Sequence, residues 1–505
     1  MNRRDWAFFL TTSIGLIFIF PPLPTGFLAP FVLIPYFFLV EKHSPWMLAK
    51  IGYVAGLIWG MGTIYWIGWA TVPGLLGALL VFALYFALYS FLQGWFYQVW
   101  GKTAFWFAPV LWFFVEWFSS LGPMAFPWNA LAYSQASYPV LIQFASYVGT
   151  YGVGFWLVLL NVLIYKAVVN RHLKQRCIIP VFFAICLVLI PLVYGMTVVS
   201  HKEKPEMSMQ VTLVQGNIDP YKKWTASFID SNITIYETLT RQTVNNETGL
   251  VVWPETAVPG YLKYRYSYLK RIRALVDSLD TPLVVGAPDY RWIEKGQAEF
   301  YNSVFLVEPN RHHMQQYSKM HLVPFSERVP LVSEFPALYR LIKKMIMDIG
   351  DFTPGDSLTA MDIGNDPGKR FGTVICFDSV FPQHVRNLIA MESRFLVIIT
   401  NDGWFGRTSG PYQHASMAVL RAIENGVDVV RCANTGVSCF VDRYGYVKQA
   451  TPIYQRKVIQ QPIDLYEKET FYVRYGHVWI WIMAISTGIL SLVTGGKQII
   501  GRRQS

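Results

Sequence analysis

Three side chains in the middle of this 505-residue sequence have the chemistry of a nucleophile, a base and a cation. The nucleophile is Cys376, which follows the short apolar run Phe371–Ile375, and such a run is typical of a buried β-strand. A thiol held rigidly at a strand end beside a base can act as a nucleophile. The alternative is a small buried apolar residue, which is the usual state of a free cysteine. The choice between the two depends on the neighbours of Cys376.

Glu255 has the same placement, because it follows the apolar run Leu250–Trp253 and a proline. The carboxyl ends of strands in an α/β sheet collect at one edge, so residues far apart in the sequence can meet there. A carboxylate beside a thiol can take its proton as a general base. The alternative is a carboxylate in the first turn of a helix, which is common after strands. We interpret Glu255 as the candidate base.

Lys319 is the candidate cation, and it precedes a loop that contains Pro324 and Pro330. A fixed cation beside Cys376 would favour the thiolate and would stabilise the oxyanion that forms when a thiolate attacks a carbonyl group. Glu327 could hold this lysine in position through an ion pair. The alternatives are a solvated surface lysine and an exposed ion-pair partner.

The composition differs from that of a soluble protein, with 53% hydrophobic, 16% aromatic and 15% charged residues. Residues 1–199 hold nine Lys or Arg and three Asp or Glu, whereas residues 200–475 are nearly neutral. The formal net charge of +11 therefore belongs to loops between apolar runs and not to a nucleic-acid-binding surface. The five cysteines show no paired spacing, and no zinc-ligand spacing occurs. The sequence predicts no disulfide framework, no metal and no cofactor.

Eight apolar runs are long enough to cross a bilayer. Basic loops alternate with uncharged loops, so the positive-inside rule places both chain ends in the cytoplasm and residues 200–475 on the opposite side. We expect a bundle of about seven helices at 1–200, a globular domain at 205–470, a last transmembrane helix at 476–495 and a cytoplasmic tail at 496–505. The runs cover residues 6–22, 25–40, 47–69, 73–99, 103–120, 138–165, 178–199 and 476–495.

Apolar strands and amphipathic helices alternate between residues 205 and 470, which indicates an α/β layer architecture. The strands are expected near residues 210–218, 250–253, 282–287, 302–308, 371–376, 395–400 and 436–442. The helices are expected near residues 225–246, 262–278, 381–392 and 412–427.

Two features of the membrane part have open interpretations. Glu116 lies inside an apolar run, so it is either a functional acid or a hydrogen-bond partner of a neighbouring helix. The segment Ala125–Gln135 is aromatic and uncharged, and it lies on the side of the globular domain. It is either an interfacial belt or the mouth of a lipid-accessible cavity, with Trp128 as a candidate substrate contact.

The segment Leu331–Ile349 carries apolar residues at helical spacing, with Arg340, Lys343 and Lys344 on the opposite side. One interpretation is an amphipathic helix packed on the core. The other is a mobile lid at 331–352 that rests on the membrane, because the segment directly follows the lysine loop and carries cations suited to lipid phosphates.

At these residues the sequence resembles the nitrilase, or carbon–nitrogen hydrolase, superfamily, whose members use a Glu-Lys-Cys triad. Such a domain between about seven spans and one resembles the bacterial apolipoprotein N-acyltransferases over nearly the whole chain. The fold implied is a polytopic α-helical membrane domain plus an αββα sandwich on the extracytoplasmic side of the inner membrane. The matches are Trp253-Pro254-Glu255-Thr256, Lys319 with Pro324–Glu327, Ile375–Asp378, Val214–Asn217, Tyr301–Ser303, Thr400–Gly406, Gln413-His414 and Arg431–Gly436.

The resemblance implies a ping-pong acyl transfer. Glu255 would deprotonate Cys376, and Lys319 with the backbone N–H of Phe377 would stabilise the oxyanion. A phospholipid would be the acyl donor, and the α-amine of a diacylglyceryl-cysteine at a lipoprotein N-terminus would be the acceptor. The candidate substrate-binding residues are Trp224, Asn302, Trp404 and Trp128, with aromatic core packing as the alternative for the tryptophans. His414, Arg421, Glu424 and Arg431 are interpreted as structural.

Two positions depart from the family pattern. The sequence has Phe377-Asp378 where the family usually has Tyr-Glu, and Phe118-Ser119 where Leu-Arg commonly follows the membrane Glu-Trp pair. We expect these departures to affect headgroup recognition and rate more than the class of reaction.

Two other functions compete with acyl transfer. A membrane-anchored amidase or nitrilase would give the same thioester to water, and it would turn over without an amine acceptor. A transporter with an inactive nitrilase-like domain would keep its activity after Cys376→Ala. Against the transporter, the spans lack the buried charges and paired broken helices found in many transporters.

Overall fold

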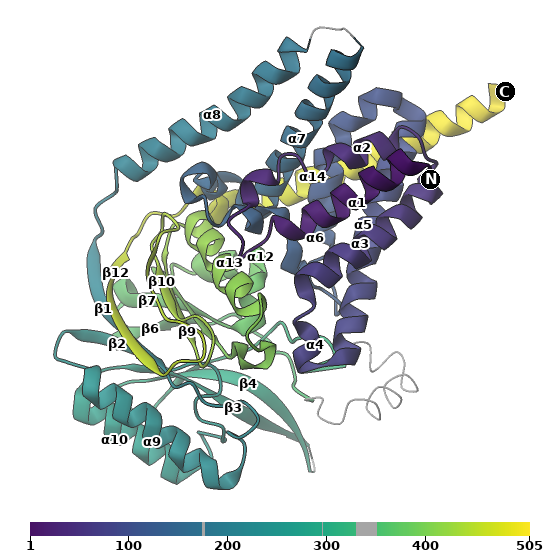
Figure 1. The fold of residues 1–505 in the computed structure, drawn as a ribbon. Helices are drawn as coiled ribbons and strands as arrows, with labels where there is room; N and C mark the ends of the chain where they lie inside the picture. Colours follow the sequence, from purple (N-terminus) through teal and green to yellow (C-terminus); the bar gives the residue numbers. More distant parts are fainter. Residues whose placement is uncertain (174–176, 295, 330–350, 505) are drawn as a thin grey trace. The chain divides into compact units, whose positions relative to one another are not determined.

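The computed structural model describes residues 1–173, 177–294, 296–329 and 351–504, and Figure 1 shows its helices and strands. The chain forms two compact units. We call Met1–Tyr65, Leu75–His201 and Tyr475–Ser505 the spanning unit, and Trp66–Gly74 with Lys202–Arg474 the α/β unit. The predicted lid at 331–352 lies outside the described residues except at its last two positions.

Within the described residues, five helical segments are long and apolar enough to cross a membrane. The segment Val72–Phe118 contains α5, a 3-10 helix at Gly101–Phe107 and α6. The α-helix is interrupted at Gly101, whose φ is +55°. Helix α1 has 16 residues and the run expected at 25–40 is helical only in part, so eight spans stay a prediction. The helices are α1 (Arg3–Phe18), α2 (Ile34–Val40), α3 (Pro45–Ile64), α4 (Ile67–Ala70), α5 (Val72–Trp100), α6 (Ala108–Phe118), α7 (Ala145–His172), α8 (Ile178–Ser200) and α14 (Phe471–Gln504).

The α/β unit contains two six-stranded sheets, with the orders β12-β1-β2-β3-β4-β5 and β11-β10-β9-β8-β7-β6. Three parallel strands form the centre of each sheet, β1-β2-β3 and β7-β8-β9, and the remaining strands are antiparallel. The strands are β1 (Met207–Gln215), β2 (Thr248–Val252), β3 (Leu283–Glu294), β4 (Gln297–Val307), β5 (Gln315–Ser318), β6 (Ala360–Asp362), β7 (Arg370–Ile375), β8 (Phe395–Thr400), β9 (Asp428–Ala433), β10 (Cys439–Val441), β11 (Val447–Ala450) and β12 (Lys457–Leu465).

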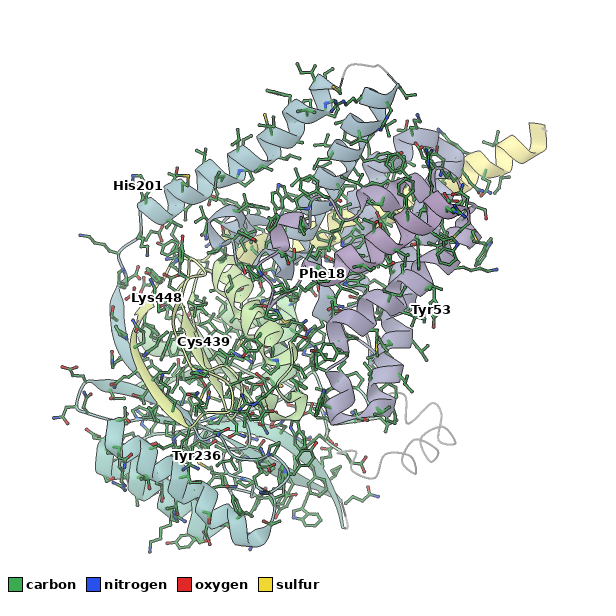
Figure 2. All side chains as sticks on the ribbon, viewed as in Figure 1. Phe18, Tyr53, His201, Tyr236, Cys439 and Lys448 are labelled. Carbon is green, nitrogen blue, oxygen red and sulfur yellow. The ribbon has the colours of Figure 1, made fainter. Side chains whose placement is uncertain are left out.

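Helices cover the outer face of each sheet. Helices α9 (Ala226–Thr243) and α10 (Tyr266–Leu279) pack on the first sheet, and α12 (Pro382–Ile389) and α13 (Gly410–Asn425) pack on the second (Figure 1). Apolar side chains of both sheets form one core between them, and a second core beneath α9 and α10 includes Tyr236, which Figure 2 labels. The layers are therefore helix, sheet, sheet and helix, which confirms the predicted αββα architecture.

The segment Trp66–Gly74 connects α3 to α5, yet it belongs to the α/β unit. Trp66 is 2% exposed, and its ring centroid lies 4.3 Å from that of Phe405. Its indole N–H donates to Gln413 Oε1 at 3.1 Å. A buried indole with its N–H satisfied holds a segment firmly, so the end of the apolar run 47–69 is part of the α/β unit.

Gly286 in β3 lets the residues that follow β2 approach the sheet closely. A Cβ atom at this position would lie 2.6 Å from the carbonyl oxygen of Pro254 and 2.8 Å from the Cα atom of Glu255. Both contacts are with backbone atoms, which cannot rotate away. The placement of Glu255 therefore depends on the absence of a side chain at Gly286.

We expect Gly286→Ala to push the Glu255 backbone away from β3. Inserting a methyl group into a packed site costs about 1–3 kcal/mol, so the thermal midpoint of the α/β unit in detergent should fall by several degrees. Gly488→Ala in α14 is the control, because a Cβ there meets nothing within 4 Å. Equal midpoints for the two variants would show that the Glu255 loop does not need Gly286.

Candidate active site

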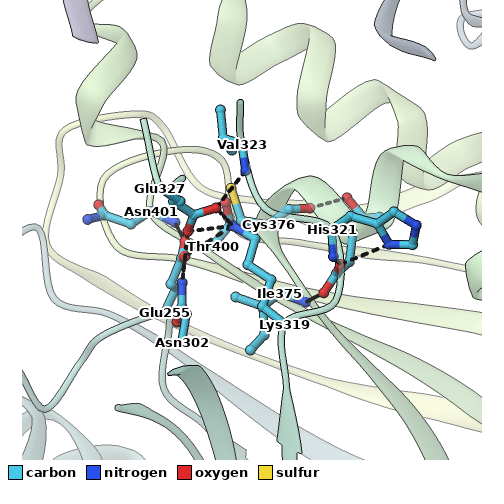
Figure 3. Close-up of polar contacts among 12 residues, drawn as sticks. Glu255, Asn302, Lys319, His321, Val323, Glu327, Ile375, Cys376, Thr400 and Asn401 are labelled. Carbon is cyan, nitrogen blue, oxygen red and sulfur yellow. Dashed lines mark hydrogen bonds and ion pairs between the residues drawn. The ribbon is translucent and has the colours of Figure 1, made fainter. Parts of the chain in front are cut away.

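Residues that follow four different strands meet between the two sheets (Figure 3). Glu255 lies three residues after β2, Lys319 directly follows β5, and Cys376 directly follows β7. Asn401 directly follows β8. The two sheets face each other across one core, so strand ends from both of them reach the same place. The structure thus brings together the three residues that the sequence singled out.

Lys319 is a buried cation between two carboxylates. It is 1% exposed, and its Nζ atom lies 2.9 Å from Glu327 Oε2 and 3.8 Å from Glu255 Oε1. Burial alone would lower the pKa of this amine, but the charges of Glu327, Cys376 and Glu255 raise the pKa above its ordinary value. A buried charge is tolerated only when it is paired, and Glu327 supplies the closer partner, as the sequence predicted.

Glu255 is held by one hydrogen bond to each carboxylate oxygen. Asn302 Nδ2 donates to Oε1 at 2.7 Å, and the backbone N–H of Asn401 donates to Oε2 at 2.8 Å. Burial raises the pKa of this carboxyl group, although the charge of Lys319 opposes the shift. A fixed carboxylate with a raised pKa can accept and keep a proton, which is what a general base requires.

Cys376 has backbone geometry that non-glycine residues rarely adopt. Its φ is +50°, in the left-handed region, and such strained residues cluster at functional sites. Ser379 Oγ donates to the Cys376 carbonyl oxygen at 2.7 Å. Burial raises the pKa of the thiol, the charge of Glu255 raises it further, and Lys319 opposes both. The thiol is therefore neutral at rest and needs a base before it can react.

A buried polar network supports the backbone of Cys376. His414 Nε2 lies 3.2 Å from the Cys376 carbonyl oxygen, and its Nδ1 lies 2.9 Å from Asp402 Oδ1. Arg431 donates to Asp402 Oδ2 at 2.7 Å. Burial alone would raise the pKa of Asp402, but Arg431 and His414 lower it to about 2. Both nitrogens of His414 contact protein atoms, so this histidine supports the candidate nucleophile, in agreement with its structural interpretation.

Asp378 connects the end of β7 to the loop that carries Lys319. Its carboxylate accepts hydrogen bonds from the Tyr317 hydroxyl at 2.8 Å and from the backbone N–H of His321 at 2.7 Å. Tyr317 also contacts His384 Nε2 at 2.9 Å. Burial alone would raise the pKa of Asp378, but the hydrogen bond from His321 and the charge of His384 lower it to about 2. Burial lowers the pKa of His384 to about 4.

The remaining predicted site residues lie in different surroundings. Asn302 also contacts Glu327 Oε1 at 3.2 Å, so its amide bridges two carboxylates. Trp224 is exposed, and the Nζ atom of Lys223 lies 5.5 Å from the centroid of its ring. Trp404 packs edge-to-face on Tyr221. Phe377 is buried against Phe381. Trp128 is buried in the spanning unit and stacks on Phe126.

Glu116, in the spanning unit, acts as a hydrogen-bond acceptor. The Trp112 indole N–H donates to its Oε1 at 2.7 Å, and the backbone N–H of Leu131 donates to the same atom at 2.8 Å. The carboxylate therefore links α6 to the segment Leu131–Gln135. Of the two interpretations of this acid, hydrogen bonding is the one that the structure shows.

Sequence reasoning missed Lys223, a second buried cation near the candidate base Glu255. Lys223 is 2% exposed, and its Nζ lies 3.4 Å from the carbonyl oxygen of Thr256. Burial lowers its pKa to about 8, and the charge of Glu255 opposes the shift. Nothing in the sequence distinguishes Lys223 from the exposed Lys222 beside it.

Glu255→Gln removes a negative charge that raises the pKa of Cys376. The rate at which iodoacetamide alkylates Cys376 can be measured as a function of pH by mass spectrometry of the Cys376 peptide. We expect this rate to rise at a pH about one unit lower in the variant than in the parent protein. Lys319→Met should shift the profile in the opposite direction, because it removes the opposing cation. A shift to higher pH in Glu255→Gln would contradict the charge coupling between Glu255 and Cys376.

The buried, neutral His384 makes stability depend on pH. Its pKa falls from 6.5 to about 4 on folding, so the unfolded chain binds more protons between these values and stability decreases as the pH falls through this window. The loss amounts to at most about 3 kcal/mol. Thermal midpoints in detergent at several pH values across this window should fall less with pH in His384→Gln than in the parent. His313→Gln, at an exposed position, should keep the parental slope.

Comparisons with known proteins identify the family of both parts of the chain. The family model for carbon–nitrogen hydrolases matches residues 210–470, and the one for the apolipoprotein N-acyltransferase N-terminal domain matches residues 12–163. The chain is 33% identical to the apolipoprotein N-acyltransferase of Geobacter metallireducens, over 99% of this chain and 96% of the relative. It is 30% identical to the apolipoprotein N-acyltransferase of Chlorobaculum tepidum, over 97% of both chains.

A third relative, apolipoprotein N-acyltransferase 2 of Treponema denticola, is 32% identical over 75% of this chain and 74% of the relative. The matched N-terminal domain and the five long apolar helices together indicate a multi-pass membrane protein. The two matched domains occur in one chain, and the full-length relatives share one name. This chain therefore belongs to the apolipoprotein N-acyltransferase family.

Proposed function

We propose that this protein transfers a fatty acyl chain from a phospholipid to the α-amino group of the N-terminal diacylglyceryl-cysteine of lipoproteins. Its membership of the family supports the class of reaction. The observation that carries the mechanism is the buried group of Cys376, Glu255 and Lys319 at the ends of three strands. A thiol with a raised pKa lies beside a carboxylate that can take its proton and a cation that can stabilise developing negative charge.

In the first half of the reaction, Glu255 takes the proton of the Cys376 thiol, and the thiolate attacks the carbonyl carbon of a phospholipid ester. Lys319 and the backbone N–H of Phe377 stabilise the oxyanion of the tetrahedral intermediate. The ester C–O bond then breaks, and the leaving alkoxide receives the proton from Glu255. Lysophospholipid departs, and the acyl chain stays on Cys376 as a thioester.

In the second half, the α-amine of the acceptor attacks the thioester carbonyl carbon and Glu255 takes a proton from the nitrogen. Lys319 again stabilises the oxyanion. The C–S bond breaks, an amide bond remains on the acceptor, and the Cys376 sulfur regains a proton from Glu255. Each half uses the same base and the same cation, which is the logic of a ping-pong enzyme.

Both proposed substrates are lipids, which gives the apolar helices a role beside the chemistry. A site that receives acyl chains at a bilayer surface can exclude the water that would hydrolyse the thioester. We place the protein in the bacterial inner membrane, with the α/β unit on the extracytoplasmic side, because basic loops alternate with uncharged ones.

A hydrolase is the second candidate, because one matched family model describes carbon–nitrogen hydrolases. The same three residues would then pass the acyl group to water. The two functions differ in what clears the thioester.

Intact-mass spectrometry of the purified protein separates the two functions. After incubation with phospholipid alone, we expect one fatty-acyl adduct that persists, because no acceptor amine is present. Addition of a diacylated lipopeptide should clear the adduct and produce an N-acylated peptide. Loss of the adduct to water as fast as its loss to the lipopeptide, or no adduct at all, would favour the hydrolase.

Single substitutions test the proposed roles. Cys376→Ala should abolish the adduct, and Glu255→Ala and Lys319→Ala should lower transfer by about a thousandfold or more, because the three residues act as a unit. Cys186→Ala, in α8, is the matched control and should keep the adduct. Phe377→Tyr should keep or raise the rate if the hydroxyl usual in the family contributes. Normal transfer by any of the three alanine variants would remove that residue from the mechanism.

A further inference from the structure

The α/β unit contains a polar cavity of about 290 Å³ on the outer face of β3, β4 and β5. Its lining includes Tyr301 of β4 and Ser318 of β5, whose chain neighbours Asn302 and Lys319 belong to the candidate active site. Successive side chains of a strand point to opposite faces. The cavity and the candidate active site therefore lie on opposite faces of the same two strands.

One buried carboxylate oxygen beside this cavity has no hydrogen-bond partner in the part of the chain that the structure describes. Asp289 is 4% exposed, and its Oδ2 accepts hydrogen bonds from Lys263 at 2.9 Å and Gln316 at 2.7 Å. Its Oδ1 is buried and has no hydrogen-bond partner among the described residues. An unsatisfied buried charged group is costly, so a donor from outside the described residues would stabilise this oxygen. The cavity is several times larger than a single water molecule.

The charges around the cavity favour N–H donors over an anion. Lys263 already pairs with Asp289, and Arg291 pairs with Glu299 at 3.0 Å and with Asp356 at 3.6 Å. A phosphate or carboxylate ligand would have to displace these partners. A donor that approaches Asp289 Oδ1 would displace none of them.

The aromatic side chains of the cavity are suited to a peptide. Tyr264 and Tyr290 stack with ring centroids 4.1 Å apart, and Tyr264 is half exposed. The guanidinium of Arg291 lies 5.6 Å above the ring of Tyr301. Tyrosine and arginine are the side chains that protein surfaces use most to bind other polypeptides. Amide N–H groups of a peptide would supply the missing donors.

We propose that this cavity binds the hydrophilic peptide that follows the acylated cysteine of the acceptor. The proposal rests on the proposed function, in which the acceptor is a polypeptide. The strand β5 is the last strand of its sheet, and beside its end the backbone N–H of Gly355 donates to the carbonyl oxygen of Lys319 at 2.8 Å. A chain leaving Cys376 would therefore pass outside Gly355 to reach the cavity. An extended peptide advances about 3.3 Å per residue, so the length of the acceptor tail decides whether it reaches the cavity.

Acceptors of two lengths test the proposal in the full-length protein. The short acceptor is a diacylglyceryl-cysteine with a blocked carboxyl group, and the long acceptor continues with a hydrophilic tail of about ten residues. We expect a lower KM for the long acceptor. Asp289→Asn and Tyr264→Ala should each reduce that advantage about tenfold, the equivalent of one hydrogen bond to a charged group. Asp230→Asn, an exposed acid on α9, should keep the advantage.

Tyr264 is half exposed, so Tyr264→Ala keeps the test valid if Asp289→Asn folds poorly. Equal KM values for both acceptors in the parent, or an undiminished advantage in both variants, would overturn the proposal.

Photocrosslinking gives a readout that needs no catalysis. A long acceptor with a photoreactive phenylalanine in its tail should label the peptide that contains Tyr264, and labelling only elsewhere would overturn the proposal. Labelling there without acyl transfer would reject the proposed function and retain the cavity as a peptide site.

Discussion

The buried ammonium group of Lys319 is the constraint on which the candidate active site depends. Glu327 holds it at 2.9 Å, and Glu255 lies on its other side at 3.8 Å. When a proton moves from Cys376 to Glu255, one buried negative charge replaces another beside the same cation. The number of buried charges stays constant during this step, so the step does not add the large penalty of burying a new charge. The proposed base and nucleophile can therefore exchange a proton in a buried site.

Two further carboxylates fix the residues around this exchange. Asp402 holds His414, which contacts the carbonyl oxygen of Cys376, and Asp378 joins the end of β7 to the loop that follows Lys319. Both carboxylates have low pKa values and stay ionised, so their hydrogen bonds persist across the physiological range. A positive φ costs about 1–3 kcal/mol, and these contacts hold Cys376 in that geometry.

The alternation of side chains along β4 and β5 relates the reaction to its proposed acceptor. Asn302 and Lys319 face the inter-sheet core, whereas Tyr301 and Ser318 line the polar cavity. The same two strands therefore position the candidate cation on one face and a peptide-sized cavity on the other. An enzyme that modifies the first residue of a polypeptide has to place the rest of that chain, and this cavity is suited to receive it.

The sequence by itself identified the candidate site residues that a pattern in their neighbouring residues marks. Cys376 and Glu255 each follow an apolar run, and an apolar run with a polar residue at its end is recognisable without any partner. It also determined the α/β layer architecture, since the alternation of strands and helices is a local pattern, and the family resemblance implied the αββα sandwich. The strands β5, β6, β9, β11 and β12 escaped prediction. Strand β5 has only four residues, of which Tyr317 alone is in the apolar core, β9 carries the buried Arg431, and β12 contains Pro462, which an edge strand tolerates.

Only the tertiary structure decided which charged residues are buried. Lys223 is buried and Lys222 is exposed, although the two are neighbours of the same type. Likewise, Trp66 belongs to the α/β unit because of Gln413, a residue 347 positions further along the chain. Burial of a polar group is favourable only where another part of the fold supplies its partner. That partner comes from a distant segment, so no local pattern in the sequence can reveal it.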